Sequence, residues 1–258
     1  LKHGKIALAA DGKRLRMTML GDEADDDRKF IGSTWTGFFD TYILPHVKKN
    51  IRFGTQVKRV DHSKSKIRLI DQAKKEHVAD KVVVTAPLKV LQRDDITFRP
   101  ELPAEKRSAI KKAKVWGGMK VFIEFTEKFF PTWLAFRDSE TSKGQRYYYD
   151  ASYGQTGKSI VMGLFTVGKQ AEPYQALKGD ALRDHILAEL DPLFGGKPTK
   201  TYVKHVAQNW NEEPFIHAAY LEDHAPDEIS RVLAKPVGKK LFFAGEAYTR
   251  DDDWGSVH

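Results

Sequence analysis

The stretch Leu241–His258, LFFAGEAYTRDDDWGSVH, joins a short apolar run to a glycine, a carboxylate and three consecutive aspartates. A glycine at the end of a strand lets the backbone approach a ligand closely. The carboxylate of Glu246 can then accept hydrogen bonds from sugar-like hydroxyl groups. The Gly-Ser-Val at 255–257 can begin a helix whose free N–H groups face an electron-rich carbonyl. Together these features suit a nucleotide-type cofactor lying across the carboxyl ends of strands.

The remainder of the chain predicts a mixed α/β fold with two clusters of strands. The apolar run KVVVTA at 81–86, stopped by Pro87, is typical of a strand buried on both faces. Aromatic and apolar residues at three- and four-residue spacing predict a helix from 33 or 34 to about 45. Further strands are expected at 51–61, 66–70, 118–125, 146–149, 159–166 and 201–208, and helices at 102–114, 169–178, 181–190 and 226–233.

Composition excludes several classes of function. The 258 residues are 41% hydrophobic and 30% charged, which is ordinary for a globular protein. No apolar run approaches the roughly 18 to 20 residues of a membrane helix. The first residues, LKHG, contain neither a signal-peptide core nor a starting methionine, so the cellular compartment stays open. The net charge of +8 is spread along the chain among acidic residues, which favours a solvated basic surface over a nucleic-acid platform.

Several kinds of catalytic or metal site are also excluded. The chain has no cysteine, so it can form no disulfide, thiolate zinc site, cysteine nucleophile or cysteine-linked flavin. The nine histidines lack a metal-binding spacing, and no metal is expected. The segment ASYGQTGKS at 151–159 nearly matches a phosphate-binding loop, but a strand-like run follows where a helix is required, so we interpret it as a hairpin loop. No GxSxG nucleophile elbow occurs.

Two further stretches each allow two interpretations. In the strand GMKVFIEF at 118–125, alternation places Lys120 with Phe122 and Glu124 on the face opposite the larger apolar residues. Periodicity alone favours solvent on that face, although a cleft would satisfy the same alternation. The segment WNEEPFIHAAY at 210–220 places two aromatic residues around a proline. These rings either pack in a core or form a wall beside a flat ligand.

Five segments follow one another along the chain: IRFGTQVKRVDHS (51–63), VVVTAPLKVLQRDDITFRPELPAEKRSAI (82–110), GGMKVFIEF (117–125), WNEEPFIHAAY (210–220) and LFFAGEAYTRDDDWGSVH (241–258). In this order and spacing the chain resembles the flavin-dependent amine oxidases, which include polyamine oxidases, monoamine oxidases and lysine-specific histone demethylases. The closing GSVH is most similar to the polyamine oxidases. The resemblance implies two interleaved domains. A layered FAD-binding domain, incomplete here, would comprise 31–98 and 236–258, and a mixed-sheet substrate domain would comprise 1–30 and 99–235.

The resemblance also implies roles for individual residues. Lys120 matches the lysine that holds a water against flavin N5, and it is the expected catalytic residue. Val57 matches the position whose backbone meets the adenine, and Thr85 with the following APL matches the segment at the edge of the cofactor. The other implied FAD-binding residues are Trp210 and Tyr220 beside the isoalloxazine, Gly245 and Glu246 at the ribityl or phosphate region, and Gly255, Ser256 and Val257 at the flavin pyrimidine.

The implied activity is the oxidation of an amine, most consistently a polyamine, to an imine, with hydrolysis to an aldehyde and release of H2O2. FAD would be bound without a covalent link. Asp251, Asp252 and Asp253 are expected to attract the distal ammonium of a polyamine; otherwise they form a solvated loop. Ser256 stands where monoamine oxidases carry a cage tyrosine, which argues against a two-tyrosine cage.

The sequence also departs from the family pattern. The GxGxxG turn that binds the pyrophosphate is absent, so this chain alone is expected to bind FAD poorly. A preceding segment or a second chain would supply that half of the site. The alternative function is therefore a non-catalytic or partner-dependent subunit that keeps the oxidase fold. The expected partners are a small amine and O2, with neither a nucleic acid nor a membrane.

Overall fold

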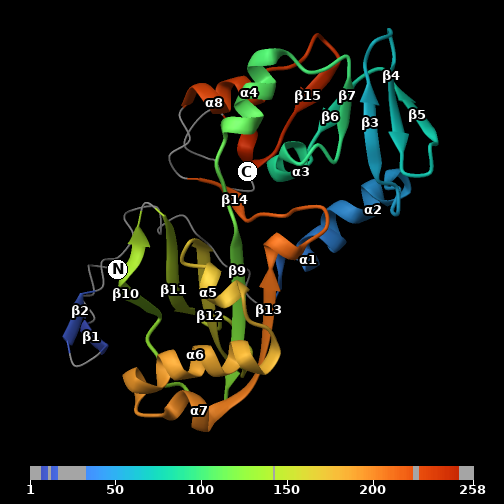
Figure 1. The fold of residues 1–258 in the computed structure, drawn as a ribbon. Coiled ribbons are helices and arrows are strands. Elements are labelled where there is room, and N and C mark those ends of the chain that lie inside the picture. Colours follow the sequence, from blue (N-terminus) through green and yellow to red (C-terminus); the bar gives the residue numbers. More distant parts are fainter. Residues whose placement is uncertain (1–6, 11–12, 17–32, 142, 223–226, 250–258) are drawn as a thin grey trace. The chain divides into compact units, whose positions relative to one another are not determined.

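The computed structural model describes residues 7–10, 13–16, 33–141, 143–222 and 227–249, drawn in colour in Figure 1. These residues form two compact units. Unit 1 contains the described residues up to Ile51 together with Gly118–Asn209, and unit 2 contains Arg52–Gly117 together with the described residues from Trp210 onward. Each unit joins segments that are far apart in the sequence and contains both helices and sheets. The predicted mixed α/β fold class is confirmed.

A five-stranded antiparallel sheet forms the centre of unit 1, in the order β10-β11-β12-β9-β13 (Figure 1). Its strands are β9 (Gly118–Phe125), β10 (Trp133–Thr141), β11 (Gly144–Asp150), β12 (Ile160–Gly168) and β13 (Tyr202–Asn209). The sequence analysis did not predict β10, which pairs with β11 through an irregular register. On the central strand β9, Lys120 lies opposite Phe165 of β12 and Gln208 of β13.

Helix α6 (Gly179–Phe194) supplies the apolar residues that cover one face of this sheet. Leu182, Ile186 and Leu190 recur every four residues and are almost fully buried, in one cluster with Val121 and other sheet residues. This spacing places them on a single side of the helix. The shorter helices α5 (Glu172–Gln175) and α7 (Lys197–Thr201) flank α6 in the sequence. The predicted helix over 169–178 is therefore limited to α5.

The other described segments of unit 1 come from the start of the chain. Strands β1 (Ala7–Ala10) and β2 (Lys13–Arg16) form an antiparallel pair. Residues 35–50 form a helical run made of α1 (Trp35–Phe38), the π-helix η2 (Phe39–Ile43), α2 (Leu44–Val47) and the 3-10 helix η3 (Lys48–Asn50). Thr34 caps the run, since its Oγ1 accepts a hydrogen bond from the Gly37 amide at 3.0 Å. The predicted helix start at 33 or 34 is confirmed.

The described residues of unit 2 form three small sheets. The four-stranded sheet has the order β5-β4-β3-β7 and is made of β3 (Val57–Asp61), β4 (Ile67–Asp71), β5 (Glu76–Ala79) and β7 (Thr97–Arg99). Strands β6 (Val82–Val84) and β15 (Leu241–Phe243) pair in parallel. Strands β8 (Val115–Trp116) and β14 (Tyr220–Leu221) pair antiparallel. The helices are α3 (Leu88–Gln92), α4 (Ala104–Lys112), α8 (Asp227–Ala234), and the 3-10 helices η4 (Trp210–Glu212) and η5 (Glu246–Tyr248).

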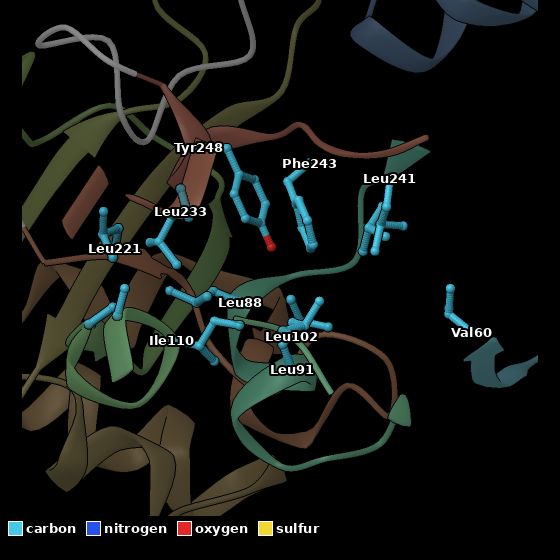
Figure 2. Packing of buried hydrophobic residues seen from close by; sticks show 14 of the residues in the cluster. Val60, Leu88, Leu91, Leu102, Ile110, Leu221, Leu233, Leu241, Phe243 and Tyr248 are labelled. Atoms are coloured by element: carbon cyan, nitrogen blue, oxygen red, sulfur yellow. The ribbon is translucent and has the colours of Figure 1, made fainter. Parts of the chain in front are cut away.

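The core of unit 2 surrounds β15 and η5. Figure 2 shows Phe243 next to Tyr248, whose ring centroids are 5.9 Å apart, with Leu241 on the same strand. Buried leucines and isoleucines from α3, α4 and α8 complete this cluster. The predicted burial of the valine run on both faces is wrong for Val83, which is 56% exposed while Val84 is buried. A two-stranded sheet packs only one of its faces on this core.

The bounds of the two compact units differ from the bounds of the predicted domains. Residues 99–117 and the described residues of 210–235 group with 52–98. Gln92 of α3 donates to the Ile110 and Ala113 carbonyls, and β8 pairs with β14. Residues 33–51 group with the sheet of unit 1. The assignment of FAD to one domain and substrate to the other stays a prediction. Among the described residues, every helix lacks the length or the apolar composition that crossing a bilayer requires.

Lys106 is a buried lysine that joins two helices of unit 2. Its Nζ donates hydrogen bonds to the carbonyl groups of Val232 and Leu233, at 2.9 and 2.5 Å, and lies 4.0 Å from the ring centroid of Phe243. The amine thereby satisfies carbonyls in the last turn of α8, which lack partners within the helix. Burial lowers the pKa of Lys106 to about 8.

This pKa makes the stability of unit 2 dependent on pH. An unfolded lysine titrates near 10.4, so above pH 8 the folded chain binds fewer protons than the unfolded chain. The free energy of unfolding should therefore rise by about 1.8 kcal/mol between pH 7.5 and 9.5. Urea titrations across this range should show the rise in the wild-type chain and its loss in Lys106→Met. An equal rise in both proteins would contradict the assignment.

Candidate functional site

The parallel pairing of β6 and β15 brings two predicted cofactor segments to one edge of a sheet. Phe243 lies opposite Val84, and the amide of Ala244 donates to the Val84 carbonyl at 3.1 Å. Thr85 follows β6, and Gly245 and Glu246 follow β15. All three residues therefore lie at the same carboxyl edge of the sheet. In α/β folds, ligands bind in the crevice outside this edge.

Gly245 turns the chain sharply at this edge. Its φ of 134° and ψ of −179° lie in a region that is open essentially only to glycine. The turn leads directly into η5, where a carboxylate oxygen of Glu246 accepts a hydrogen bond from the Leu221 amide at 3.2 Å. Glu246 is therefore positioned next to β14, the strand that carries Tyr220. Three predicted residues, Gly245, Glu246 and Tyr220, thus belong to one connected region of unit 2.

Tyr248 links this region to the segment after β6. Its hydroxyl group donates to the Ala86 carbonyl at 3.3 Å. Burial, together with the nearby charge of Glu246, raises the pKa of Tyr248 well above the ordinary tyrosine value. The phenol therefore stays protonated and can act as a fixed donor. The sequence analysis did not single out Tyr248, although a tyrosine two residues after the expected site acid was a visible signal.

A cavity of about 540 Å3 in unit 2 contains another predicted residue, Val57, at the start of β3. Ala86 and Pro87, which follow Thr85, line the same cavity. Thr85 itself is not among the lining residues. The rest of the lining consists of Arg52, Phe53, Gly54, Thr55, Gln56, Gln72, Val90, Asp95, Ile96, Pro214 and Phe215. The cavity therefore joins Val57, predicted to meet the adenine, to Ala86 and Pro87 of the segment predicted at the cofactor edge.

The cavity lining is mostly apolar, and Arg52 is one of its charged residues. Arg52 Nη1 donates to His77 Nδ1 at 2.9 Å, which leaves the His77 Nε2–H to donate to an Asp71 carboxylate oxygen at 2.9 Å. The hydrogen bond from His77 is the largest effect that lowers the pKa of the buried Asp71. Arg52 is thereby held in place in the cavity lining. The sequence analysis treated 51–56 as part of a strand, but β3 begins only at Val57.

The aromatic segment 210–220 lies within unit 2. Trp210 begins η4 and is half-buried. The ring of Tyr220 meets the edge of Trp116 across β14 and β8, with a centroid distance of 5.9 Å and an interplanar angle of 60°. Between these two residues, Phe215 lines the cavity and is 60% exposed. The sequence analysis missed Phe215, the member of this segment that contributes a ring to the cavity.

Lys120 belongs to unit 1, and the predicted alternation along β9 is confirmed. The residues on one face of β9 are buried, whereas Lys120, Phe122 and Glu124 on the other face are not fully buried. Burial lowers the pKa of the Lys120 amine. Within the described residues its Nζ forms no hydrogen bond or ion pair, and its aromatic neighbour is Phe165, 5.6 Å from the ring centroid. A half-buried amine without a counter-ion is a candidate functional group.

An aromatic stack on the same sheet face ends at Lys120. The ring of Trp133 stacks on Tyr147, with centroids 4.0 Å apart, and Tyr147 stacks on Phe165 at 4.7 Å. Tyr147 and Phe165 are directly opposite each other on β11 and β12, so their side chains project from the same face. The stack restricts Phe165, and with it the surroundings of the Lys120 amine.

Several predicted residues lie outside the described ranges: Asp251, Asp252, Asp253, Gly255, Ser256 and Val257. Among the described residues, no three histidine, aspartate or glutamate side chains come together in a way that could hold a metal ion. A glycine-only turn, a carboxylate at a carboxyl edge, and a neighbouring apolar cavity fit the parts of a dinucleotide. The turn admits a close backbone approach, the carboxylate accepts from hydroxyls, and the cavity takes a flat ring.

Comparison with known proteins identifies the family of the chain. The family described as "Flavin containing amine oxidoreductase" matches residues 13–257. Lysine-specific histone demethylase 1 homolog 3 of Arabidopsis thaliana is 29% identical over 214 residues, which cover 81% of this chain and 13% of that protein. Probable polyamine oxidase 4 of Arabidopsis thaliana is 27% identical over 214 residues, covering 81% of this chain and 42% of that protein.

Among solved structures, a putrescine oxidase variant redesigned in cofactor binding shares the fold, with a TM-score of 0.62 at 17% identity. The similarity covers 79% of this chain and 45% of that one. The chain thus spans less than half the length of each of these relatives. Because the family match extends over nearly the whole sequence, this chain belongs to the flavin-containing amine oxidoreductases.

Proposed function

We propose that this chain forms part of an FAD-dependent oxidase that converts an amine, most consistently a polyamine, to an imine. Water then hydrolyses the imine to an aldehyde and an amine. The observation that carries the proposal is the convergence of 85–87, Gly245 and Glu246 at the carboxyl edge of the β6–β15 sheet, with Ala86, Pro87 and Val57 lining one cavity. The family membership and the polyamine oxidase relatives support it.

FAD would be held by residues of unit 2. The backbone of Val57 would meet the adenine in the cavity, and Glu246 would accept a hydrogen bond from the ribityl chain. No cysteine is present to form a thioether, so we propose noncovalent binding. When bound, FAD supplies the two-electron oxidation of the carbon–nitrogen bond and the reduction of O2 to H2O2.

Lys120 is the proposed catalytic residue. Its amine has a lowered pKa and can donate a hydrogen bond to one ordered water, because no described residue occupies its donors. Such a water would be oriented for the hydrolysis of the imine. In its protonated form the amine would also favour the accumulation of negative charge on O2. The neighbouring stack through Phe165 limits the access of bulk water to one side of the amine.

The substrate amine must be unprotonated at the carbon–nitrogen bond that is oxidised, which favours a pocket with little water. The overall charge of +8 does not attract a polycation at long range. We therefore propose that local acids, Asp251, Asp252 and Asp253, bind the distal ammonium group of a polyamine.

A second candidate is a subunit that keeps the oxidase fold and depends on a partner chain for its cofactor. The absence of GxGxxG in this sequence favours it, because that turn binds the pyrophosphate in dinucleotide sites. Purified protein, alone and with any co-purifying chain, can be assayed for flavin absorbance and for H2O2 release from spermidine. Activity of the chain together with a second polypeptide, and none without it, would identify this candidate.

Glu246→Gln should weaken FAD binding more than it slows amine oxidation. Glutamine keeps an oxygen that accepts from the Leu221 amide but removes the charge that strengthens a bond to a ribityl hydroxyl. The expected loss is about 1.5 to 3 kcal/mol of binding free energy. Flavin fluorescence during serial dilution measures it. Glu105→Gln, at an exposed ion pair with Lys235, is the control. Equal flavin retention in all three proteins would contradict the role.

Lys120→Met should slow imine hydrolysis or flavin reoxidation tenfold or more. Each tenfold loss of rate corresponds to an activation free energy that is higher by about 1.4 kcal/mol. Methionine keeps most of the bulk and removes both the donor and the charge. Stopped-flow absorbance of the flavin-loaded protein separates the two half-reactions. Lys204→Met is a suitable control, because Lys204 lies on the neighbouring strand and pairs with Glu124. Wild-type rates in both half-reactions would refute the proposed role of Lys120.

Replacement of Asp251, Asp252 and Asp253 together by asparagine should raise KM for a triamine more than for a monoamine. Only the triamine carries a distal ammonium group for these carboxylates to attract. Steady-state H2O2 assays with spermidine and with butylamine provide the comparison. If KM changes by the same factor for both amines, the three aspartates form a solvated loop without a role in substrate binding.

A further inference from the structure

The loop 52–56 forms one side of the cavity in unit 2, and its conformation is not that of a strand. Every residue from Arg52 to Val57 lines the cavity. Gly54 has a φ of +65°, in the left-handed region that glycine adopts readily. The loop places Phe53 beside the cavity with 85% of its surface exposed. A loop with this much exposed surface needs support from outside itself.

Gln72, at the end of β4, provides that support through three hydrogen bonds. Its side-chain Oε1 accepts from the Gln56 amide at 2.6 Å, and its Nε2 donates to the Gly54 carbonyl at 2.6 Å. Its own backbone amide donates to the Gln56 carbonyl at 2.9 Å. One planar amide thus fixes both an N–H and a C=O of the loop. Alanine at 72 would lose both side-chain bonds and keep the backbone bond.

The loop held by Gln72 faces a second exposed ring. Phe215, from the segment after η4, lines the same cavity and is 60% exposed. Large exposed aromatic side chains around a mostly apolar cavity are typical of a site for a flat hydrophobic ligand.

We propose that Gln72 is a positioning residue for the adenine end of the cofactor. It holds loop 52–56 so that the Val57 backbone and the Phe53 ring are arranged before the ligand binds. A preordered loop binds more tightly because less conformational entropy is lost on association. The inference rests on the proposed function, which assigns this cavity to the adenine of FAD.

The test compares Gln72→Ala with Gln92→Ala. Gln92 is a matched control, since its Nε2 donates to the carbonyls of Ile110 and Ala113, at 2.8 and 2.7 Å, away from this cavity. Ligand-observed NMR titrations of the whole chain would use FAD, AMP and FMN. Gln72→Ala should weaken FAD and AMP binding about tenfold, whereas FMN, which lacks adenine, should bind as to the wild type. Gln92→Ala should leave all three affinities unchanged.

Gln72→Glu provides a second variant if alanine destabilises the chain. It keeps the acceptor for Gln56 and replaces the donor to Gly54 with a second oxygen, so FAD and AMP should bind about three- to fivefold more weakly. Wild-type affinity for AMP in either folded variant would overturn the positioning role while leaving the proposed function intact. An equal loss for FMN would overturn the adenine assignment. A wild-type chain that binds AMP no more tightly than FMN would overturn this inference, whereas the proposed function fails only if no flavin is retained when the missing pyrophosphate-binding segment is also supplied.

Discussion

The parallel pairing of β6 with β15 is the interaction on which the cofactor region depends. It joins Val82–Val84 to Leu241–Phe243 across most of the length of the chain, which carries a large loop-closure cost in entropy. The apolar cluster around Leu241, Phe243 and Tyr248 offsets that cost by removing these side chains from water (Figure 2). Because the two strands run in the same direction, their carboxyl ends and the residues that follow them meet at one edge. Antiparallel pairing would separate 85–87 from Gly245 and Glu246.

Lys106 and Lys120 are both shielded from water, but the groups around the two amines differ. Both amines are removed from water, which disfavours the charged form. Lys106 recovers part of this loss through two carbonyl groups of α8 and the face of Phe243, so it joins helices. Lys120 has no hydrogen-bond acceptor or counter-ion among the described residues, and its Nζ lies farther from its aromatic neighbour, 5.6 Å from the Phe165 centroid. A partly buried amine with so little compensation is a good candidate for a functional role.

Much of the site is held by hydrogen bonds between side chains and backbone. Gln72 fixes loop 52–56, Glu246 accepts from the Leu221 amide, and Tyr248 donates to the Ala86 carbonyl. Each bond connects segments that are distant in the sequence, and each acts next to the cavity or the sheet edge. The loop 52–56 and Ala86 lie outside regular secondary structure. Side-chain donors and acceptors therefore form the hydrogen bonds that strand pairing supplies within a sheet.

The sequence by itself determined the mixed fold class, the two faces of β9 and the order of segments that marks the family. These properties follow from local periodicity and from motifs, which are present in the residues themselves. Only the tertiary structure decided that 52–56 is a loop, that Val83 is exposed, and that Phe215 and Gln72 line the cavity of Val57. Each depends on contacts between residues far apart in the chain. The same local sequence pattern is compatible with a strand and with an exposed loop. Here the hydrogen bonds from Gln72, outside this segment, stabilise the loop.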